Sequence, residues 1–550
     1  MAKRHEDYLL QRFWGKSVVL TGSELSKEIC EKFPDCTKEN ARKIIQNAVK
    51  NNIIKSSKPL TLGHNQYAYY GHQHYLSKDT LKNLMEQNRP ALHRIIQRLS
   101  QNGGVISYIE AFKISAATVE KGSTKVNTLN KTIAILENMG LVRKESNWGV
   151  NYLVEYNLEQ SDAIYLMKEH HYKIQLDCMF IPSFLIWLQK HNLINSNNII
   201  YRNKKKLGDG VIHNNLIWDA YAYTSTTGLY EHIGNDEEKQ TLVVLDFKIR
   251  DSYDSLDLSG FYNRIQIHRN SVKNKNSKRK ILPIVVANKI DSDAKKELNK
   301  LKILSFDLGT VFGERIYEII NKLKILSTQD IANISPLNND IYDKDFTQYI
   351  KEILSALKES GQSENLGNLK GELFERLMYS VIFKIYGKNI CQIHHSFCLN
   401  RTFENGKKEG YEYDYVVETS DEFIIFELKG YKGSTLIRKG KFNEETKKPE
   451  QNTVKWFFGL TYPFIKKHFQ SNPFNKPIKA CYITTAKFDK SAEDMLQKQN
   501  KSKDKPEGLD IFYDGDKLIE LLNKYNLKKE IQVINQYYKS KKENDNKYSL

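Results

Sequence analysis

Apolar residues recur along the start of the chain at the spacing of amphipathic helices. One such segment is SELSKEICEKF, residues 23–33. Thr37 opens a second, TKENARKIIQNAVKNN, whose apolar residues share one face: Ala41, Ile44, Ile45 and Val49. The stretch IIKSSKPLTLGHNQYAYYG then alternates and turns as a hairpin does. The pattern predicts three helices followed by a two-stranded hairpin within residues 1–75.

This order resembles a winged helix, a fold that binds DNA. The resemblance implies that the second amphipathic segment faces a DNA groove through Lys38, Asn40, Arg42 and Lys43. Residues 76–158 repeat the theme, with helical patterns in SKDTLKNLMEQNRPALHRIIQRLSQ and STKVNTLNKTIAILENMGLV before a wing-like RKESNWGVNYLVEY. The alternative for both regions is an ordinary helical packing domain.

The pattern changes to strands between helices over residues 159–330. The runs LIWDAYAY, TLVVLDFKI and ILPIVVANKI are typical of buried strands. An Asn- and Pro-containing linker, NISPLNNDIYD, precedes a last α/β domain at 345–530, and 531–550 reads as a flexible basic tail. We therefore expect an α/β multidomain protein.

Composition narrows the class of partner. The chain has 550 residues and a net charge of +18, which favours a polyanion, although a lysine-rich surface gives the same excess. No apolar run is long enough for a membrane span, and the first residues lack the pattern of a signal peptide, so we expect a cytoplasmic protein without membrane contact. The 6 cysteines fit reduced thiols, and no phosphate-binding P-loop motif is present.

One apolar strand carries charges that need an explanation. In FIIFELKG, residues 423–430, alternation places Glu427 and Lys429 on one face. An ionised group taken out of water costs several kcal/mol unless a partner compensates it. The pair therefore indicates a functional site.

Two further acids are expected to join this pair. Asp414 lies in the neighbouring strand pattern YEYDYVVE, and Glu375 lies at the margin of the apolar stripe of the helix KGELFERLMYSVIFKIYG. Glu372 in the same helix is predicted to point into solvent. Three close carboxylates raise each other's pKa unless a cation joins them, and oxygen ligands of this kind suit Mg²⁺ or Mn²⁺. Lys429 would then orient or help to deprotonate water, or hold a phosphate oxygen, during hydrolysis of a phosphodiester.

At these residues the chain resembles the PD-(D/E)xK nuclease superfamily, and within it the Mrr-type restriction endonuclease domain. The likeness extends to CYITTAKFDKSAEDML and LDIFYDGDKLIELLNKY and covers about residues 366–525. It implies a restriction-endonuclease-like α/β fold and metal-dependent cleavage of DNA by Asp414, Glu427 and Lys429, with Glu375 as accessory acid. Some Mrr-type enzymes carry Gln where this chain has Glu427. The alternative is a decayed nuclease fold retained for binding.

The strand TLVVLDFKI repeats the pattern, because Asp246 and Lys248 share one face and Asp219 in LIWDAYAY takes the place of Asp414. A second catalytic and metal-binding set is one interpretation, and a structural ion pair is the other. The preceding helix MFIPSFLIWLQKHNL lacks an acid equivalent to Glu375, with Asp177 as a possible substitute. This departure favours a degenerate domain.

A second metal pattern is weaker. CQIHHSFC contains four zinc-ligand types, but alternation along a strand sends His394 and Cys398 to one face and Cys391 and His395 to the other. Tetrahedral zinc needs its ligands to converge, so we do not expect a zinc site.

The sequence thus predicts a cytoplasmic, Mg²⁺- or Mn²⁺-dependent DNA endonuclease that hydrolyses double-stranded DNA. By analogy with the family, it would act in restriction or other phage defence, as a homodimer or with a defence-system partner protein. Two alternatives are a non-catalytic DNA-binding regulator and an effector nuclease activated by a nucleotide or nucleic acid.

Overall fold

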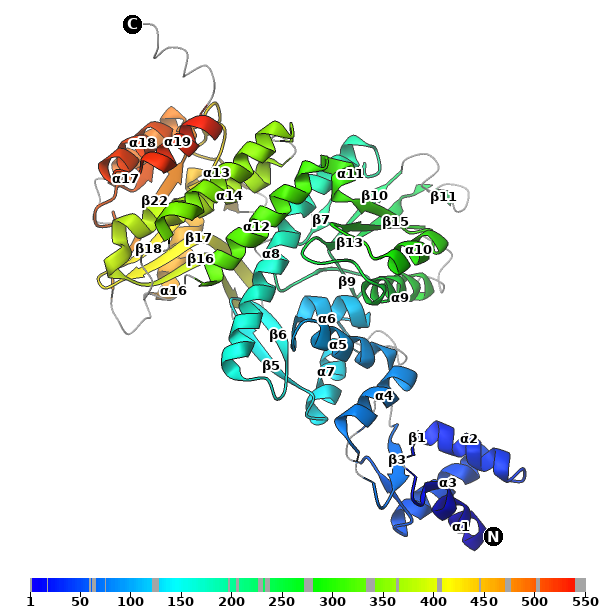
Figure 1. Cartoon of the computed structure of the whole chain (residues 1–550). Helices are drawn as coiled ribbons and strands as arrows, with labels where there is room; N and C mark the ends of the chain where they lie inside the picture. Colours follow the sequence, from blue (N-terminus) through cyan, green and yellow to red (C-terminus); the bar gives the residue numbers. More distant parts are fainter. Residues whose placement is uncertain are drawn as a thin grey trace, which may run out of the picture. The chain divides into compact units, whose positions relative to one another are not determined.

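The computed structural model describes most of the 550-residue chain, which divides into two compact units. Unit 1 comprises residues 1–172, 194–202 and 208–305, and unit 2 comprises 173–193, 203–207 and 306–550. Both contain helices and sheets, as expected for an α/β multidomain chain (Figure 1). The described residues are 2–16, 18–58, 61, 66–74, 76–120, 128–195, 198–203, 207–225, 231–232, 238–271, 280–332, 342–362, 366–402, 408–444, 447–469, 476–500 and 505–539.

The start of unit 1 has the order helix, strand, two helices and two strands. Its elements are α1 (Ala2–Phe13), β1 (Val19–Thr21), α2 (Gly22–Lys32), α3 (Lys38–Lys50), β2 (Ile54–Ser56) and β3 (Ala68–Gly71). The strands form an antiparallel sheet in the order β1-β3-β2. The Thr37 hydroxyl accepts a hydrogen bond from the amide of Asn40 and caps α3, so the predicted helix start is confirmed.

The next part of unit 1 repeats this order. It contains α4 (Lys78–Asn88), α5 (Pro90–Gln101), β4 (Val105–Ser107), α6 (Tyr108–Ser115), α7 (Leu129–Asn138), β5 (Val142–Asn147) and β6 (Val150–Glu155). Its sheet has the order β4-β6-β5, which matches β1-β3-β2 when α5, α6 and α7 are set against α1, α2 and α3. The sequence pattern missed α6 as a separate helix, in which Ile109, Glu110, Ala111, Ile114 and Ser115 are buried.

A five-stranded sheet follows, in the order β15-β14-β13-β10-β7. Strand β13 pairs antiparallel with β10 and parallel with β14, and every residue of β13 is buried. The strands are β7 (Ile200–Tyr201), β10 (Ala220–Thr224), β13 (Thr241–Lys248), β14 (Ile281–Ala287) and β15 (Leu304–Asp307). The accompanying elements are α8 (Gln160–Lys190), β8 (Val211–His213), β9 (Leu216–Trp218), β11 (Glu231–His232), β12 (Glu238–Lys239), α9 (Ser255–Ser271) and α10 (Ser292–Lys300).

The C-terminal sheet of unit 2 has the order β16-β17-β18-β22-β24. Strand β18 pairs antiparallel with β17 and parallel with β22. The strands are β16 (Ile390–Thr402), β17 (Lys408–Thr419), β18 (Phe423–Lys429), β22 (Ile478–Thr484) and β24 (Phe512–Tyr513). The other elements are α14 (Gly367–Tyr386), η3 (Gly387–Asn389), β19 (Leu436–Ile437), β20 (Phe442–Asn443), β21 (Lys448–Pro449), α15 (Val454–Trp456), η4 (Phe457–Thr461), α16 (Tyr462–Phe469), β23 (Lys487–Phe488), α17 (Lys490–Asn500) and α18 (Gly515–Lys524).

The two five-stranded sheets share their strand order, and the pairs β7-β10, β10-β13 and β13-β14 have the same directions as β16-β17, β17-β18 and β18-β22. Setting β7, β10, β13, β14 and β15 against β16, β17, β18, β22 and β24 matches every neighbour. The register matches as well, because Ala220 pairs with Leu245 in one sheet and Tyr415 pairs with Phe426 in the other. Each of these pairs adjoins the two acids, because Ala220 and Tyr415 follow Asp219 and Asp414, and Leu245 and Phe426 precede Asp246 and Glu427. The sequence likeness between the two strand patterns therefore extends to backbone pairing.

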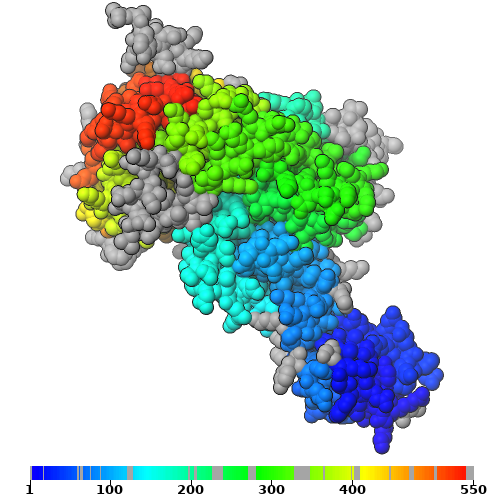
Figure 2. All heavy atoms as spheres, in the orientation of Figure 1, coloured from blue at the N-terminus to red at the C-terminus, as the bar shows by residue number. Residues whose placement is uncertain are grey.

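Helices α11 (Leu308–Phe312), α12 (Arg315–Ala332), α13 (Tyr342–Glu359) and α19 (Lys528–Tyr537) complete unit 2. The hydroxyl of Thr347 on α13 donates to Glu530 Oε1 on α19 at 2.8 Å, and these helices lie side by side (Figures 1 and 2). The predicted tail therefore begins too early, because Val533, Ile534 and Tyr537 are buried within α19. Residues 540–550 and most of the predicted linker, 333–341, lie outside the described residues.

None of the helices in the described ranges combines the length and apolar character needed to cross a bilayer.

Candidate functional site

Three of the predicted residues converge at the middle of the C-terminal sheet. Asp414 comes from β17, and Glu427 and Lys429 come from β18. Lys429 Nζ lies 2.7 Å from Glu427 Oε1 and 3.3 Å from Asp414 Oδ2. All three side chains are largely buried, so these ion pairs are little screened by water.

The backbone around Lys429 is fixed by several contacts. Asp414 Oδ2 accepts the amide of Leu428 at 2.6 Å, and the Thr484 hydroxyl donates to the carbonyl of Lys429 at 2.8 Å. At Gly430 an added Cβ would lie 2.4 Å from the Cβ of Phe374, so a residue without a side chain lets α14 approach the end of β18. These contacts hold the strand end, and with it Lys429, against α14 and β22.

Three acids and one lysine interact electrostatically at this site. Burial, together with the charges of Glu427 and Glu375, raises the pKa of Asp414 well above its usual value, and Lys429 does not offset these effects. Burial would lower the pKa of Lys429, but Asp414 and Glu427 outweigh it and raise that pKa well above its usual value. Lys429 is therefore an ammonium group at neutral pH, with Asp414, Glu427 and Glu375 around it.

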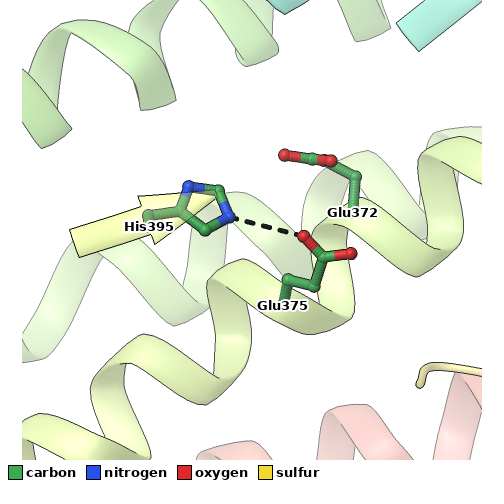
Figure 3. A group of neighbouring side chains, drawn as sticks. All are labelled: Glu372, Glu375 and His395. Atoms are coloured by element: carbon green, nitrogen blue, oxygen red, sulfur yellow. Dashed lines mark hydrogen bonds and ion pairs between the residues drawn. The ribbon is translucent and has the colours of Figure 1, made fainter. Parts of the chain in front are cut away.

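Helix α14 contributes two acids instead of one. Glu375 lies toward the sheet as predicted, and its Oε2 is 3.4 Å from Nε2 of His395 on β16 (Figure 3). The prediction that Glu372 points into solvent is wrong, because Glu372 is 2% exposed and its carboxylate lies close to Glu375 and His395. The prediction assumed one buried face, whereas buried residues occupy most sides of α14.

The donor set fits a divalent cation. Asp414 and Glu427 offer buried carboxylate oxygens, and Glu375 is close enough to raise the pKa of Asp414. Hard oxygen ligands with excess negative charge are what Mg²⁺ and Mn²⁺ require. Asp414, Glu427 and Glu375 are thus the residues that could hold such an ion.

The four zinc-ligand types of β16 have different surroundings. His395 faces Glu375 and stacks on Tyr415, whereas His394 contacts Gln392 through its Nε2 at 3.3 Å. Cys391 is exposed, and the side chain of Cys398 lies outside the described residues. The two histidines follow the alternation expected of a strand.

The sheet β15-β14-β13-β10-β7, here called the middle sheet, holds Asp219 with the same backbone contact that holds Asp414 in the C-terminal sheet. Asp219 Oδ2 accepts the amide of Phe247 at 2.7 Å, as Asp414 accepts the amide of Leu428 in the C-terminal sheet. Asp219 directly precedes β10, and Asp246 lies in β13. The two acids are 0% and 1% exposed, so both are fully withdrawn from water.

Cations surround these middle acids. Lys113 Nζ on α6 lies 2.5 Å from Asp219 Oδ2 and 3.1 Å from Asp246 Oδ1. Arg202 binds Asp219 at 2.9 Å, and Arg264 binds Asp246 at 2.8 Å. Burial would raise the pKa of Asp219, but Lys113 and Arg202 outweigh it and lower that pKa. Three cations thus compensate two carboxylates.

Lys248 has a different partner from the one expected. Its Nζ lies 2.5 Å from Asp257 Oδ2, while Lys113 takes the position beside Asp246. Arg98 on α5 also binds Asp257, at 2.9 Å. Asp177, considered as a substitute helix acid, is buried on the part of α8 that belongs to unit 2.

The four residues expected to face DNA lie on the exposed side of α3. Lys38, Asn40, Arg42 and Lys43 are all exposed, whereas Ala41 and Ile45 of the same helix are buried. The amphipathic pattern of this segment therefore correctly predicted which side of α3 is exposed and which is buried.

Sequence reasoning missed Lys113, Arg202 and Arg264, and it considered His395 only as a zinc ligand. A signal existed for Lys113, because Glu110 and Lys113 are the only charged residues of the otherwise apolar helix YIEAFKIS. Both form ion pairs with residues on other elements. Lys113 pairs with Asp219 and Asp246, and Glu110 pairs with Arg250 at 2.6 Å. The local pattern does not show which residues Glu110 and Lys113 pair with.

Comparisons with known proteins are limited to distant structures. No protein-family model and no curated protein matches this chain. Protein VC1899 from Vibrio cholerae is similar with a TM-score of 0.21 and 11% identity, over 46% of this chain and 91% of that protein. Can2 from Sulfobacillus thermosulfidooxidans, solved in complex with cyclic tetra-adenylate, is similar with a TM-score of 0.15 and 14% identity, over 55% of this chain and 79% of Can2. At these TM-scores neither likeness bears on what this chain does.

Proposed function

We propose that the chain is a metal-dependent endonuclease of the PD-(D/E)xK type, with its active site at Asp414, Glu427, Lys429 and Glu375. The observation that carries the proposal is the buried lysine held by two carboxylates at 2.7 and 3.3 Å, with a third acid close by. A purely structural cluster would be expected to balance its charges, as the middle sheet does. Three acids gathered around one lysine favour a site that binds a cation.

Each residue has a distinct role in this proposal. Asp414 and Glu427 hold a divalent ion together with Glu375, and the amide of Leu428 orients Asp414. Lys429, kept protonated by its two carboxylates, donates a hydrogen bond to a phosphate oxygen or to the attacking water, and does not act as a base. The bound ion supplies stabilisation of the negative charge that develops on the phosphate.

We assign no cleavage to the middle sheet. Its acids are neutralised by Lys113, Arg202 and Arg264, and Lys248 is engaged by Asp257. These contacts favour a structural role for Asp219, Asp246 and Lys248, although Asp246 and Lys248 pair with other residues and not with each other. The sheet is then a degenerate copy of the nuclease core that anchors α5 and α6.

DNA binding is assigned to the first winged-helix-like part, residues 2–74. Its helix–strand–helix–helix–hairpin order and the exposed Lys38, Asn40, Arg42 and Lys43 support a helix placed in a DNA groove. In the second part, the β5-β6 turn and α6 pack against other elements of unit 1. The turn residue Trp148 packs against His171 of α8, and an added Cβ at Gly260 of α9 would lie 2.4 Å from the carbonyl of Lys113 on α6.

Double-stranded DNA is the proposed substrate, and restriction of foreign DNA in the cytoplasm is the proposed setting. One centre cuts one strand, so cleavage of a duplex requires a homodimer or a defence-system partner protein. The test is incubation of the protein with supercoiled plasmid, linear duplex and RNA, in Mg²⁺, Mn²⁺ or EDTA. Because the sequence also allows a ligand-activated nuclease, cyclic tetra-adenylate, the ligand in the Can2 structure, is added in a parallel series.

Replacing Glu427 by Gln or Lys429 by Met is expected to reduce plasmid cleavage by at least about 100-fold, because each change removes a charge from the proposed centre. Binding of duplex DNA should be unchanged, since the proposed DNA-binding helix is α3. Cleavage by both variants at the wild-type rate, using protein with a wild-type melting profile, would exclude this centre.

Asp246→Asn is expected to leave conversion of plasmid to linear product intact. Linear product should then increase more steeply than nicked product with protein concentration, because two chains supply the two cuts. Gel analysis of nicked and linear DNA over a concentration series measures both quantities. If Asp246→Asn gives nicked DNA alone, the middle sheet is a second catalytic centre.

The double change Arg42→Ala and Lys43→Ala is expected to weaken duplex binding and to reduce its salt dependence by about two counterions. Fluorescence anisotropy over a range of salt concentrations provides the measurement. Lys295→Ala with Lys296→Ala removes the same charge from exposed positions of α10 and serves as the control. Equal losses in the two double variants would argue against α3 as the binding surface.

Lys113→Met is expected to destabilise unit 1 by about 3 kcal/mol, because it leaves Asp219 and Asp246 buried with less compensation. Thermal and chemical denaturation of the full chain report the loss. Lys131→Met, at an exposed position of α7, is the control and should have little effect. A melting profile of Lys113→Met identical to that of Lys131→Met would show that the buried contacts contribute little.

A further inference from the structure

A second group of ligand-type side chains lies next to the proposed active site. Glu372 and Glu375 project from α14, and His395 projects from β16 (Figure 3). One potential ligand atom from each residue lies within 4.8 Å of the other two. The side chains of Glu372, Glu375 and His395 are 1%, 14% and 20% exposed. The group is therefore enclosed by protein and is not a chance cluster on the surface.

The local structure aims these three groups at one point. Residues three apart on a helix lie about 60° apart around its axis, so Glu372 and Glu375 share one side of α14. His395 stacks on Tyr415, with ring centroids 4.8 Å apart and an interplanar angle of 24°, and this contact orients the imidazole. Tyr415 is adjacent to Asp414 in β17, so the imidazole is held by the strand that carries the proposed catalytic acid.

The dimensions and the donor types suit a transition-metal ion. Two ligands of a six-coordinate ion are about 3 Å apart when adjacent and about 4.2 Å apart when opposite, so side-chain movements of about 1–2 Å would bring these atoms into range. Arg376 Nε lies 3.7 Å from Glu372 Oε1, an ion pair longer than a hydrogen bond, with which an incoming cation competes. Mg²⁺ prefers oxygen ligands, whereas an imidazole nitrogen favours first-row transition ions.

We propose that Glu372, Glu375 and His395 form a second divalent-cation site, which takes a first-row transition ion such as Mn²⁺ in preference to Mg²⁺. Glu375 belongs both to this site and to the proposed catalytic set, so an ion bound here lies beside the reacting phosphate. The consequence for cleavage rests on the proposed nuclease function, but ion binding itself does not.

The test uses the full-length protein and Mn²⁺ as probe. Free Mn²⁺ is measured by electron paramagnetic resonance during titration, with millimolar Mg²⁺ present to occupy oxygen-only sites. Four proteins are compared: wild type, Glu372→Gln, His395→Ala and His394→Ala. His394 is the matched control, because it is the neighbouring histidine on the same strand and contacts Gln392. Circular dichroism and thermal melts establish that each variant is folded.

The expected result is one Mn²⁺ site that resists Mg²⁺ in the wild type and in His394→Ala. Its affinity should fall by at least about tenfold in Glu372→Gln and in His395→Ala. Equal Mn²⁺ binding by all four proteins would overturn the proposal, and so would an equal loss in His394→Ala and His395→Ala.

Cleavage measurements separate this inference from the proposed function. His395→Ala should lose more Mn²⁺-supported than Mg²⁺-supported plasmid cleavage, because only the transition ion uses the imidazole. If the wild-type protein cleaves no nucleic acid with any ion but shows the Mg²⁺-resistant Mn²⁺ site, the nuclease proposal fails and the metal site stands. If Mn²⁺ binding is unaffected in the variants while Glu427→Gln abolishes cleavage, the metal site fails and the nuclease proposal stands.

Discussion

The properties of both five-stranded sheets depend on how their buried carboxylates are compensated. In each sheet an aspartate beside the central strand accepts the amide that lies between an acid and a lysine, at 2.7 Å from Phe247 and 2.6 Å from Leu428. This contact fixes the acid in the sheet, where ionisation is costly without compensation. The groups around the acid then determine whether lysine and arginine side chains neutralise it or whether the site can accept another cation.

The buried carboxylates of the middle sheet are compensated by cationic side chains from outside its own strands. Lys113 arrives from α6, and Arg264 from α9. Further buried pairs join the same elements, including Arg98 of α5 with Asp257 and Arg250 with Glu110 of α6. These pairs tie the second helical part to the middle sheet within unit 1. The same carboxylates that would bind a metal in an open site serve here as anchors for a neighbouring domain.

In the C-terminal sheet, Lys429 binds both Asp414 and Glu427. Helix α14 instead adds Glu375 and Glu372, and it approaches closely because Gly430 leaves space for Phe374. Packing therefore increases the negative charge at one sheet and cancels it at the other, although the backbone frame is shared. We interpret this difference as the physical basis for assigning catalysis to the C-terminal sheet.

The sequence by itself determined most of the longer elements and the central acids. Alternation identified β13 and β18 with their charged pairs, and helical periodicity placed Lys38, Asn40, Arg42 and Lys43 on the exposed side of α3, because these patterns depend on neighbours a few residues away. Only the tertiary structure decided the surroundings of those charges. Lys113 is 106 residues from Asp219, and His395 is 20 residues from Glu375 on a different element. Burial of Glu372 likewise depends on what covers a second side of α14. Local periodicity shows that a charge lies in an apolar segment, but its partner comes from long-range packing, which the spacing of residues along the chain does not encode.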